Sequence, residues 1–436
     1  MEVRHVIPVQ MSDGGDDFQW ELAHPCRLIS SMVGSCPELE RLFLVVASRY
    51  PCDAAHRWKI IIGFDEYVPG NKLQTNNQRK CMILSFTFLE LHALRLDSAW
   101  FTPIVLRHAV LEKARGGWGA LYDQFLNLLL FGDIGFSTSG LALELGGQHV
   151  LLFADVFAVV ADLDGHRMAW DAKGANALRL CLLHPKVLKL NSDIAATDDA
   201  FVEISCSDVN RFGRAASRDI YRDADVLVAA HRRVESGAMT RTRFNNLQKI
   251  CGLNSAPHGV FADKRLRIHI DFANVITIDW VHCMLSDGVM STEAHLFISA
   301  AHSFVTMRDL ESYMKGEWCF PASIRAKSRV LWQVFQSERC PSGDKLKASA
   351  SEMLGLYALL RHFAETRMRD VVGLEPQKAS FFAACSIMDV ILLAKQGRVP
   401  LQQASGMLRR ALVDHLDKHK SAYNTENLKP KNHLLL

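Results

Sequence analysis

The sequence predicts an α/β protein with a mixed central sheet, because of the order of its apolar runs. Three strand-like runs are joined by short turns, which favours an antiparallel meander. A segment with helical spacing follows, and then a run that is apolar almost throughout, which predicts a strand buried on both faces. The runs, the helix and the last strand are expected at residues 58–64, 81–91, 100–110, 118–131 and 150–161. This order is typical of the α/β class.

The rest of the chain changes character near residue 276. Residues before it, from 176, are polar, basic and rich in turns, with one amphipathic helix expected at 219–233. After it, helices separated by Gly or Pro are expected at 279–301, 349–372, 376–396 and 400–418. We therefore divide the chain into an N-terminal segment (1–57), a sheet domain (58–175), a basic insertion (176–275), a helical region (276–423) and a polar tail (424–436) that stops inside a longer pattern.

Composition narrows the class of protein. Of 436 residues, 49% are hydrophobic, which excludes a disordered chain. No apolar stretch reaches the ~20 residues of a membrane helix, so no membrane contact is expected. The first residues lack the apolar core of a secretory signal. The eleven cysteines are scattered and odd in number, which favours reduced thiols. We expect an intracellular protein, nuclear or cytoplasmic.

Common enzyme motifs are missing from the sequence. It contains no glycine-rich phosphate loop and no Gly-x-Ser-x-Gly nucleophile elbow. The N-terminal part also lacks a zinc-finger or helix-turn-helix pattern, so recognition of a specific DNA sequence is unexplained.

The formal net charge of +3 is unevenly distributed. Residues 211–267 contain twelve Lys and Arg and five Asp and Glu, a local net charge of +7. Four arginines between 211 and 222 would form a stripe on a helix, but three aspartates lie among them and favour a solvated, charge-paired face. Fewer acids accompany the arginines that we predict to contact DNA phosphates, namely Arg232, Arg233, Arg241 and Arg243.

Two aspartates that follow strand-like runs are candidates for a metal site. Asp65 comes after the run at 58–64, and Asp162 after the run at 150–161. If the two strands are neighbours, both carboxylates lie at one edge of the sheet, where a divalent cation relieves their repulsion. Mg²⁺ prefers oxygen ligands and leaves positions for phosphate, so the pair indicates metal-dependent phosphodiester chemistry. The alternative is that each Asp is an ordinary turn residue.

Four stretches occur in an order that is typical of one family. The first is GFDEYVPGNKL (63–73) with RKCMILSFTFLEL (79–91), and the second is FAVVADLDGHRMAWDAKGANALRLCLLH (157–184). The third is IDWVHCMLSDGVMSTEAHLFI (278–298), and the fourth is KPKNHLLL (429–436). Together they resemble eukaryotic cut-and-paste transposases of the Plavaka and Kyakuja–Dileera–Zisupton type, more distantly the CACTA transposases, and the transposon-like gene families of dinoflagellates.

The resemblance implies a DDE/D transposase. Such a protein has an RNase H-like mixed sheet with flanking helices and cleaves and transfers strands of double-stranded DNA with Mg²⁺ or Mn²⁺, and a homo-oligomer is a candidate assembly. By resemblance Asp65 is the first metal ligand and Asp162 the second, with Asp164 and Asp155 as nearby alternatives.

The third acid of such a site is open. Candidates within the chain are Asp279 and Glu293, followed by Glu352 and Glu365. If the third acid lies beyond residue 436, the alternative is a catalytically inactive or truncated transposon-derived protein that acts as a DNA-binding or scaffold module.

Cys181 and His184 form a candidate structural zinc site. Cys-x-x-His spacing can place two ligands on one Zn²⁺. The resembled pattern has Cys at position 184, so His stands in its place here. The alternative is a buried thiol beside an ordinary loop histidine. Further ligands would come from His166, Cys206, His282 or Cys283. His282 has two other interpretations: it orients Asp279 by a hydrogen bond, or it faces the core.

Overall fold

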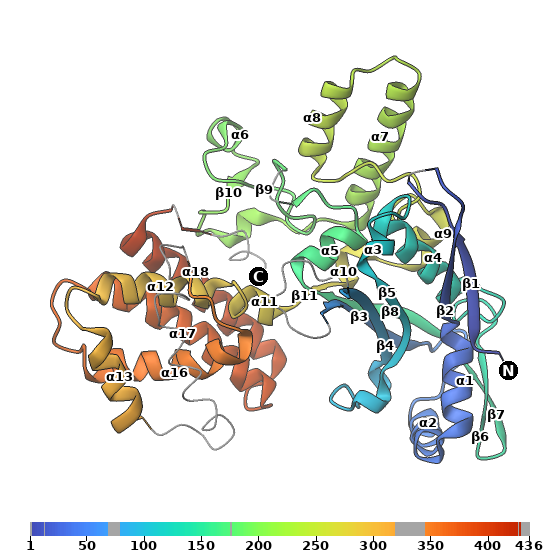
Figure 1. The fold of residues 1–436 in the computed structure, drawn as a ribbon, viewed down its shortest axis with the longest axis horizontal. Helices are drawn as coiled ribbons and strands as arrows, with labels where there is room; N and C mark the ends of the chain where they lie inside the picture. Colours follow the sequence, from blue (N-terminus) through green and yellow to red (C-terminus); the bar gives the residue numbers. More distant parts are fainter. Residues whose placement is uncertain are drawn as a thin grey trace. The chain divides into compact units, whose positions relative to one another are not determined.

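The computed structural model describes residues 2–12, 14–68, 79–174, 177–318, 345–425 and 427–428 (Figure 1). Part of the stretch 63–73 and all of 429–436 therefore lie outside the described residues. The chain forms two compact units. The first comprises Met1–Pro185 and Arg214–Thr277, and the second comprises Lys186–Gly213 and Ile278–Leu436.

The first unit is built on a five-stranded mixed sheet in the order β11-β8-β3-β4-β5. β3 pairs antiparallel with β4, β4 antiparallel with β5, and β3 parallel with β8. The predicted α/β class and mixed sheet are thus confirmed. The strands are β3 (Trp58–Tyr67), β4 (Cys81–Phe88), β5 (Phe101–Arg107), β8 (Ala154–Ala161) and β11 (Ile276–Ile278).

Helices cover one face of this sheet. The ring of Phe64 on β3 lies 5.8 Å from Trp118 and 5.4 Å from Tyr122, both on α4. Phe43, from the N-terminal helices, lies 5.8 Å from Trp58 on the same face of β3. The helices of this part are α1 (Pro25–Ser35), α2 (Pro37–Arg49), η1 (Leu89–Leu91), η2 (Asp97–Ala99), α3 (His108–Leu111), α4 (Gly117–Phe131) and α5 (Leu163–Ala169).

The opposite face of the sheet is more open. Phe157 on β8 is 47% exposed, and Lys59 and Asp65 on β3 are exposed as well. The prediction that the last strand is buried on both faces is therefore wrong. Phe157 of this strand is covered in part by Lys59 and not by a second layer of helices. The Lys59 ammonium lies 5.1 Å from the centre of the Phe157 ring.

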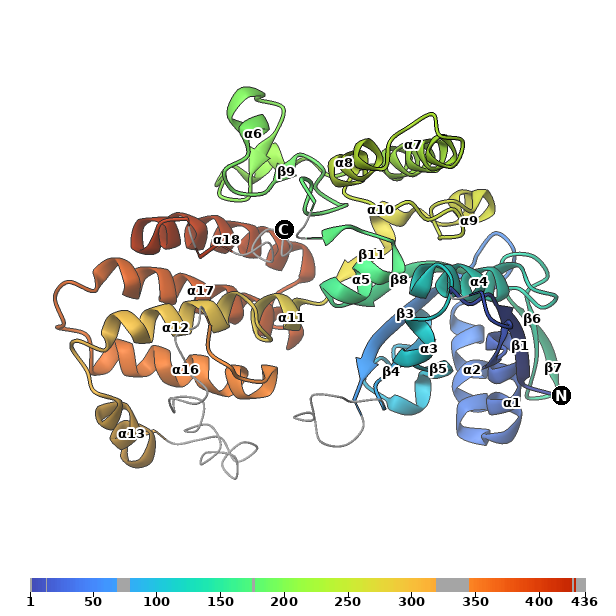
Figure 2. The same ribbon diagram turned by 45° about the horizontal axis from the view of Figure 1, so that its top comes forward.

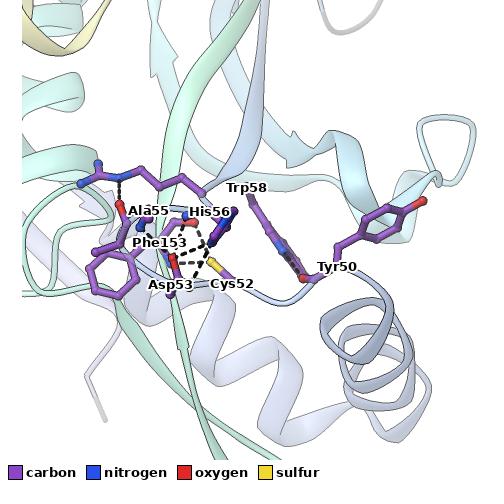
Figure 3. Close-up of polar contacts among 9 residues, drawn as sticks. Tyr50, Cys52, Asp53, Ala55, His56, Trp58 and Phe153 are labelled. Atoms are coloured by element: carbon purple, nitrogen blue, oxygen red, sulfur yellow. Dashed lines mark hydrogen bonds and ion pairs between the residues drawn. The ribbon is translucent and has the colours of Figure 1, made fainter.

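The apolar run at 150–161 is two strands, broken at Phe153 (Figure 3). Its first part, β7 (Gln148–Leu152), pairs with β6 (Leu141–Leu145) in a separate hairpin. The Phe153 amide donates to Cys52 Sγ at 3.1 Å, and its carbonyl accepts from the Trp58 amide at 2.9 Å. These bonds tie the start of β8 to the start of β3 and set the register between them.

The segment before β3 is held by its own polar contacts (Figure 3). Oδ1 of Asp53 accepts the amides of Ala55 and His56, each at 2.7 Å. The indole of Trp58 donates to the Tyr50 carbonyl at 3.0 Å. This turn thus delivers the chain from α2 into the first strand of the central sheet.

A helical hairpin and a strand hairpin complete the first unit (Figures 1 and 2). α7 and α8 pack against each other, and their connecting loop lies at the end of the hairpin away from the sheet (Figure 1). Tyr221 near the start of α7 contacts Phe272, at a ring distance of 6.0 Å. The elements are β1 (Arg4–Val9), β2 (Phe18–Ala23), α7 (Ser217–Glu235), α8 (Arg241–Cys251), α9 (Lys264–His269) and α10 (Phe272–Val275).

The second unit is mainly helical. α17 packs against α12, α16 and α18 around an apolar core. By length and composition α17 alone, among the described helices, could cross a membrane, and here it serves as a core helix of this unit. The elements are β9 (Val187–Leu188), α6 (Asp193–Thr197), β10 (Val202–Glu203), η4 (Val209–Phe212), α11 (Trp280–Met284), α12 (Val289–Ala301), α13 (Met307–Gly316), α16 (Ala350–Thr366), α17 (Glu375–Lys395) and α18 (Leu401–Tyr423).

The single helix predicted at 279–301 is two helices. α11 ends at Met284 and α12 begins at Val289. Asp287, between them, has φ of 53°, a left-handed conformation that a continuous right-handed helix excludes. The apolar spacing continues through the break, so periodicity alone did not reveal it.

Candidate functional site

The structure places Asp65 and Asp162 at the same end of two neighbouring parallel strands. The last paired residues of β3 and β8 are Gly63 and Val160. Asp65 and Asp162 each lie two residues beyond that pair. Side-chain alternation puts Asp65 on the open face of β3, whereas Asp162 lies one residue beyond β8 and its carboxylate caps α5 near the ring of Phe64. The expected adjacency of the two strands is therefore present.

The local setting of each aspartate differs from a simple turn. Asp65 lies within β3, one residue after the buried Phe64, and its Oδ1 accepts the Glu66 amide at 2.7 Å. The expectation that Asp65 follows the strand is thus corrected, because β3 continues to Tyr67. Asp162 is the N-cap of α5, and its Oδ1 accepts the Gly165 amide at 2.6 Å. Capping fixes the Asp162 side chain at the strand end.

His166 on α5 is buried next to Asp162 and packs against the sheet. His166 on α5 is 4% exposed and lies 6.2 Å from the ring of Phe64. Its Nδ1 accepts from the Trp170 indole at 2.9 Å, so its Nε2 carries the proton that bonds the Thr277 carbonyl at 2.9 Å. Burial lowers the pKa of His166, which keeps it neutral. With both ring nitrogens engaged, His166 does not serve as a zinc ligand in this arrangement.

A half-buried carboxyl group, that of Asp171, lies just after α5. Asp171 has φ of 51°, and a Cβ at Gly119 or Gly259 would overlap with its Oδ2, so the two glycines make room for it. Burial raises the pKa of Asp171 from 3.8 to about 7. Between these values the native state binds more protons than the unfolded state, so this group destabilises the fold progressively as pH rises to 7.

We predict that Asp171→Asn stabilises the protein at pH 8. Asn is neutral, nearly isosteric and tolerant of the left-handed conformation. The free energy of unfolding, measured by denaturant titration, should rise on the order of 4 kcal/mol at pH 8 and change little at pH 4. Asp97→Asn, at an exposed aspartate, is the control and should show no such difference. Equal effects of Asp171→Asn at both pH values would contradict the prediction.

The other predicted acids are distributed over both units. Asp155 lies near the start of β8 and pairs with Arg57 at 2.9 Å, and the exposed Asp164 pairs with Arg167 at 2.8 Å. In the second unit Glu352 belongs to the capping box of α16, and Glu365 pairs with Arg361 at 2.8 Å. These four carboxylates have structural partners.

Asp279 directly follows β11 and caps α11. Its side chain accepts from the Val281 amide at 2.8 Å and from His282 Nδ1 at 2.7 Å, so the expected orienting hydrogen bond from His282 is present. Burial opposes ionisation, but the hydrogen bonds from His282 and the Val281 amide lower the pKa of Asp279 overall. Asp279 is thus an oriented, ionised carboxylate of the second unit, and its role as third acid stays a prediction.

Cys181 and His184 are close to each other, with Sγ and Nδ1 3.8 Å apart. Burial raises the pKa of Cys181 to about 11 and, with Arg214, lowers the pKa of His184 to about 4. In the part of the chain that the structure describes, no group of three metal-ligand side chains includes this pair. The zinc site at Cys181 and His184 stays a prediction, and burial favours the neutral thiol and the neutral imidazole of the pair.

The four arginines predicted to contact DNA lie at the loop end of the α7–α8 hairpin. Arg232 and Arg233 are in the last turn of α7, and Arg241 and Arg243 are in the first turn of α8. All four are exposed, and within the described residues their guanidinium groups make no ion pair. The guanidinium of Arg241 lies 5.5 Å above the ring of Phe244. We call these four residues the arginine tip.

The arginines nearer the start of α7 have partners of their own. Arg222 pairs with Asp219 at 3.4 Å, while Asp223 and Asp225 are neutralised by Arg179 and Arg267 from other elements. Among the described residues Arg222 is thus the one stripe arginine that pairs with a stripe aspartate, and because α7 begins at Ser217, Arg211 and Arg214 do not belong to the predicted helical stripe. The arginine tip, by contrast, presents uncompensated positive charge.

The remaining candidate, Glu293, is in the interior of the second unit. It is 1% exposed, and its carboxylate contacts His415, His419 and Ser380. The ligand atoms of Glu293, His415 and His419 all lie within 4.8 Å of one another, so this group could hold a metal ion. Burial opposes ionisation of Glu293, but the two histidines lower its pKa to about 2.

The two histidines of this group were missed by the sequence analysis. They are four residues apart on one helix, a spacing that puts two ligands on the same face. That spacing was available in the sequence as His-x-x-x-His, but the predicted helix ended one residue before His419.

Comparisons with known proteins add no assignment. No protein-family model and no curated protein sequence matches the chain.

Proposed function

We propose that this protein cleaves and transfers strands of DNA by divalent-metal-dependent phosphodiester chemistry at Asp65 and Asp162. One observation supports it above the others. Asp65 on β3 and Asp162 directly after β8 are far apart in sequence, yet both lie at the same end of two paired parallel strands, two residues beyond the last pair. The resemblance to DDE/D transposases named the same two residues independently of this pairing.

The strand order supports the RNase H-like interpretation. An antiparallel meander, β3-β4-β5, is followed by α4 and then by β8, which returns parallel beside the first strand. This arrangement makes the first and last of these strands neighbours, as a site with one acid on each requires. It also leaves one face open for a large substrate, because the helices cover the other face.

The residues at the strand ends fit Mg²⁺ or Mn²⁺. Both groups are carboxylates, which are the oxygen ligands that these ions prefer. A bound ion would supply Lewis-acid stabilisation of charge on the phosphate oxygens. Asp65 and Asp162 would hold the ion, and the α5 cap would keep Asp162 oriented. The third acid stays an expectation of the resemblance, and Asp279 is the remaining candidate, because the Glu293 carboxylate is buried in the helical core.

The arginine tip supports DNA as the substrate. Four exposed guanidinium groups on a protruding hairpin can contact successive phosphates without reading sequence. Because this surface is separate along the chain from the two aspartates, it also supports the second candidate function, a DNA-binding module without catalytic activity.

A plasmid assay separates these functions. The full chain is incubated with supercoiled double-stranded DNA and Mg²⁺, Mn²⁺ or a chelator, and nicked and linear products are quantified. The proposal expects nicking with either metal and none with chelator. DNA binding without nicking under any of these conditions would contradict the catalytic proposal and favour the binding module.

A further inference from the structure

A polar cluster occupies the core of the helical unit. Glu293 comes from α12, His415 and His419 from α18, and Ser380 from α17. All four residues are at most 2% exposed. Buried ionisable groups are costly unless they are paired or bind a metal, so this cluster requires a specific stabilising arrangement.

Both histidines point a ring nitrogen at the same oxygen of Glu293. His415 Nε2 lies 2.9 Å from Oε1, and His419 Nδ1 lies close to the same atom. Ser380 Oγ donates to the carboxylate, 3.0 Å from Oε2. Two imidazole nitrogens and a carboxylate oxygen thus converge on one point, which is the donor set that binds first-row transition metals.

Two neighbouring polar atoms have no hydrogen-bond partner. In the part of the chain that the structure describes, His419 Nε2 and the Tyr423 hydroxyl are buried and unpaired. Tyr423 lies one turn after His419, with the rings 5.3 Å apart. Burial and the Glu293 carboxylate raise the pKa of Tyr423, so its hydroxyl is a neutral donor facing the cluster. The hydrogen bonds within the cluster therefore leave one buried ring nitrogen and one buried hydroxyl without a partner among the described residues.

We propose that Glu293, His415 and His419 bind one Zn²⁺ ion that joins α12 to α18. Zn²⁺ is favoured over Mg²⁺ because two of the three ligands are imidazoles, and Mg²⁺ prefers oxygen ligands and keeps its waters. The ion replaces the protons that otherwise sit between the imidazoles and Oε1. Ser380 orients the carboxylate from the third helix, and the Tyr423 hydroxyl lies on the same face of α18 as the ligands.

The site is structural. Its ligands are enclosed by the helical core, so a DNA phosphate has no access to them in this fold. Zn²⁺ binding should therefore stabilise the second unit. It should not take part in the chemistry proposed for Asp65 and Asp162, which would use a different ion. Asp65→Asn should accordingly retain Zn²⁺ in full, which separates this proposal from the proposed function.

The test is metal content and metal-dependent stability of the full chain. Protein stripped with chelator and returned to Zn²⁺ should retain about one equivalent after desalting, and Mg²⁺ should not replace it. Zn²⁺ should raise the unfolding temperature, and Co²⁺ should give the intense visible absorption of a low-symmetry nitrogen–oxygen site. His419→Gln and His415→Gln should retain less than about a tenth of an equivalent.

Controls keep the result interpretable. His302→Gln removes an exposed histidine at the end of α12 and should bind Zn²⁺ as the wild type does. If the buried variants fail to fold, the Co²⁺ spectrum and the Zn²⁺-dependent stability of the wild type still decide the matter. A folded, stripped wild type that takes up no Zn²⁺ and gains no stability from it would overturn the proposal and leave a hydrogen-bonded cluster without metal.

Discussion

Asp65→Asn and Asp162→Asn are each expected to reduce metal-dependent DNA nicking by about 10³-fold while the protein stays folded. Each substitution removes one negative charge from the pair that would hold the ion, and the amide is a weak ligand for Mg²⁺. Folding should survive for separate reasons. Asp65 is exposed, and Asn caps a helix about as well as Asp does at position 162.

Asp155→Asn is the matched control for these variants. Asp155 lies on β8 as well, but near the opposite end of the strand, where it pairs with Arg57. Loss of this partly exposed ion pair should cost little stability and leave nicking unchanged. Circular dichroism and denaturant titration check the folding of all three variants. Equal loss of nicking in Asp155→Asn, or full nicking in Asp65→Asn, would contradict the assignment of the site.

The arginine tip should dominate non-specific DNA affinity. Arg232→Gln with Arg233→Gln, and Arg241→Gln with Arg243→Gln, are each expected to lower the salt slope of log affinity by about 2, because each lost phosphate contact contributes about 0.9. All four substitutions together should weaken binding at low salt on the order of 10²-fold. Gln keeps helix propensity, so the hairpin should remain folded.

Arg218→Gln with Arg222→Gln provides the comparison on the same helix. These arginines are exposed near the start of α7, and Arg222 already pairs with Asp219. Fluorescence anisotropy with a short duplex at several salt concentrations measures every slope. The prediction fails if the control pair lowers the slope as much as either tip pair does.

The sheet could be predicted from the sequence because its strands have strong local patterns. β3, β4 and α4 lie where apolar runs and helical spacing place them. The break at Phe153 was not predictable, because it depends on hydrogen bonds to Cys52 and Trp58, about a hundred residues away in the chain. A run of apolar residues predicts a strand, but it does not show which distant backbone or side-chain groups form hydrogen bonds with that strand.

The candidate site could be predicted only in part. The aspartates at the ends of two strands were visible, since strand ends are marked by polar residues. That β3 and β8 are parallel neighbours follows from the fold as a whole, and the sequence supplied it only through resemblance. The Glu293 cluster could be predicted only in part for the same reason: the His-x-x-x-His spacing is visible in the sequence, but His415 is 122 residues from Glu293, and helix packing brings them together.

Iron-directed cleavage of the polypeptide tests most directly whether Asp65 and Asp162 share one divalent ion. Fe²⁺ replaces Mg²⁺, and with ascorbate and peroxide it produces hydroxyl radicals that cut the backbone near the bound ion. The His419→Gln variant is used so that the helical unit does not bind the iron. We predict two sets of cuts, one near residue 65 and one near residue 162, both suppressed by excess Mg²⁺. Cuts at one position without the other, or at neither, would contradict a shared ion.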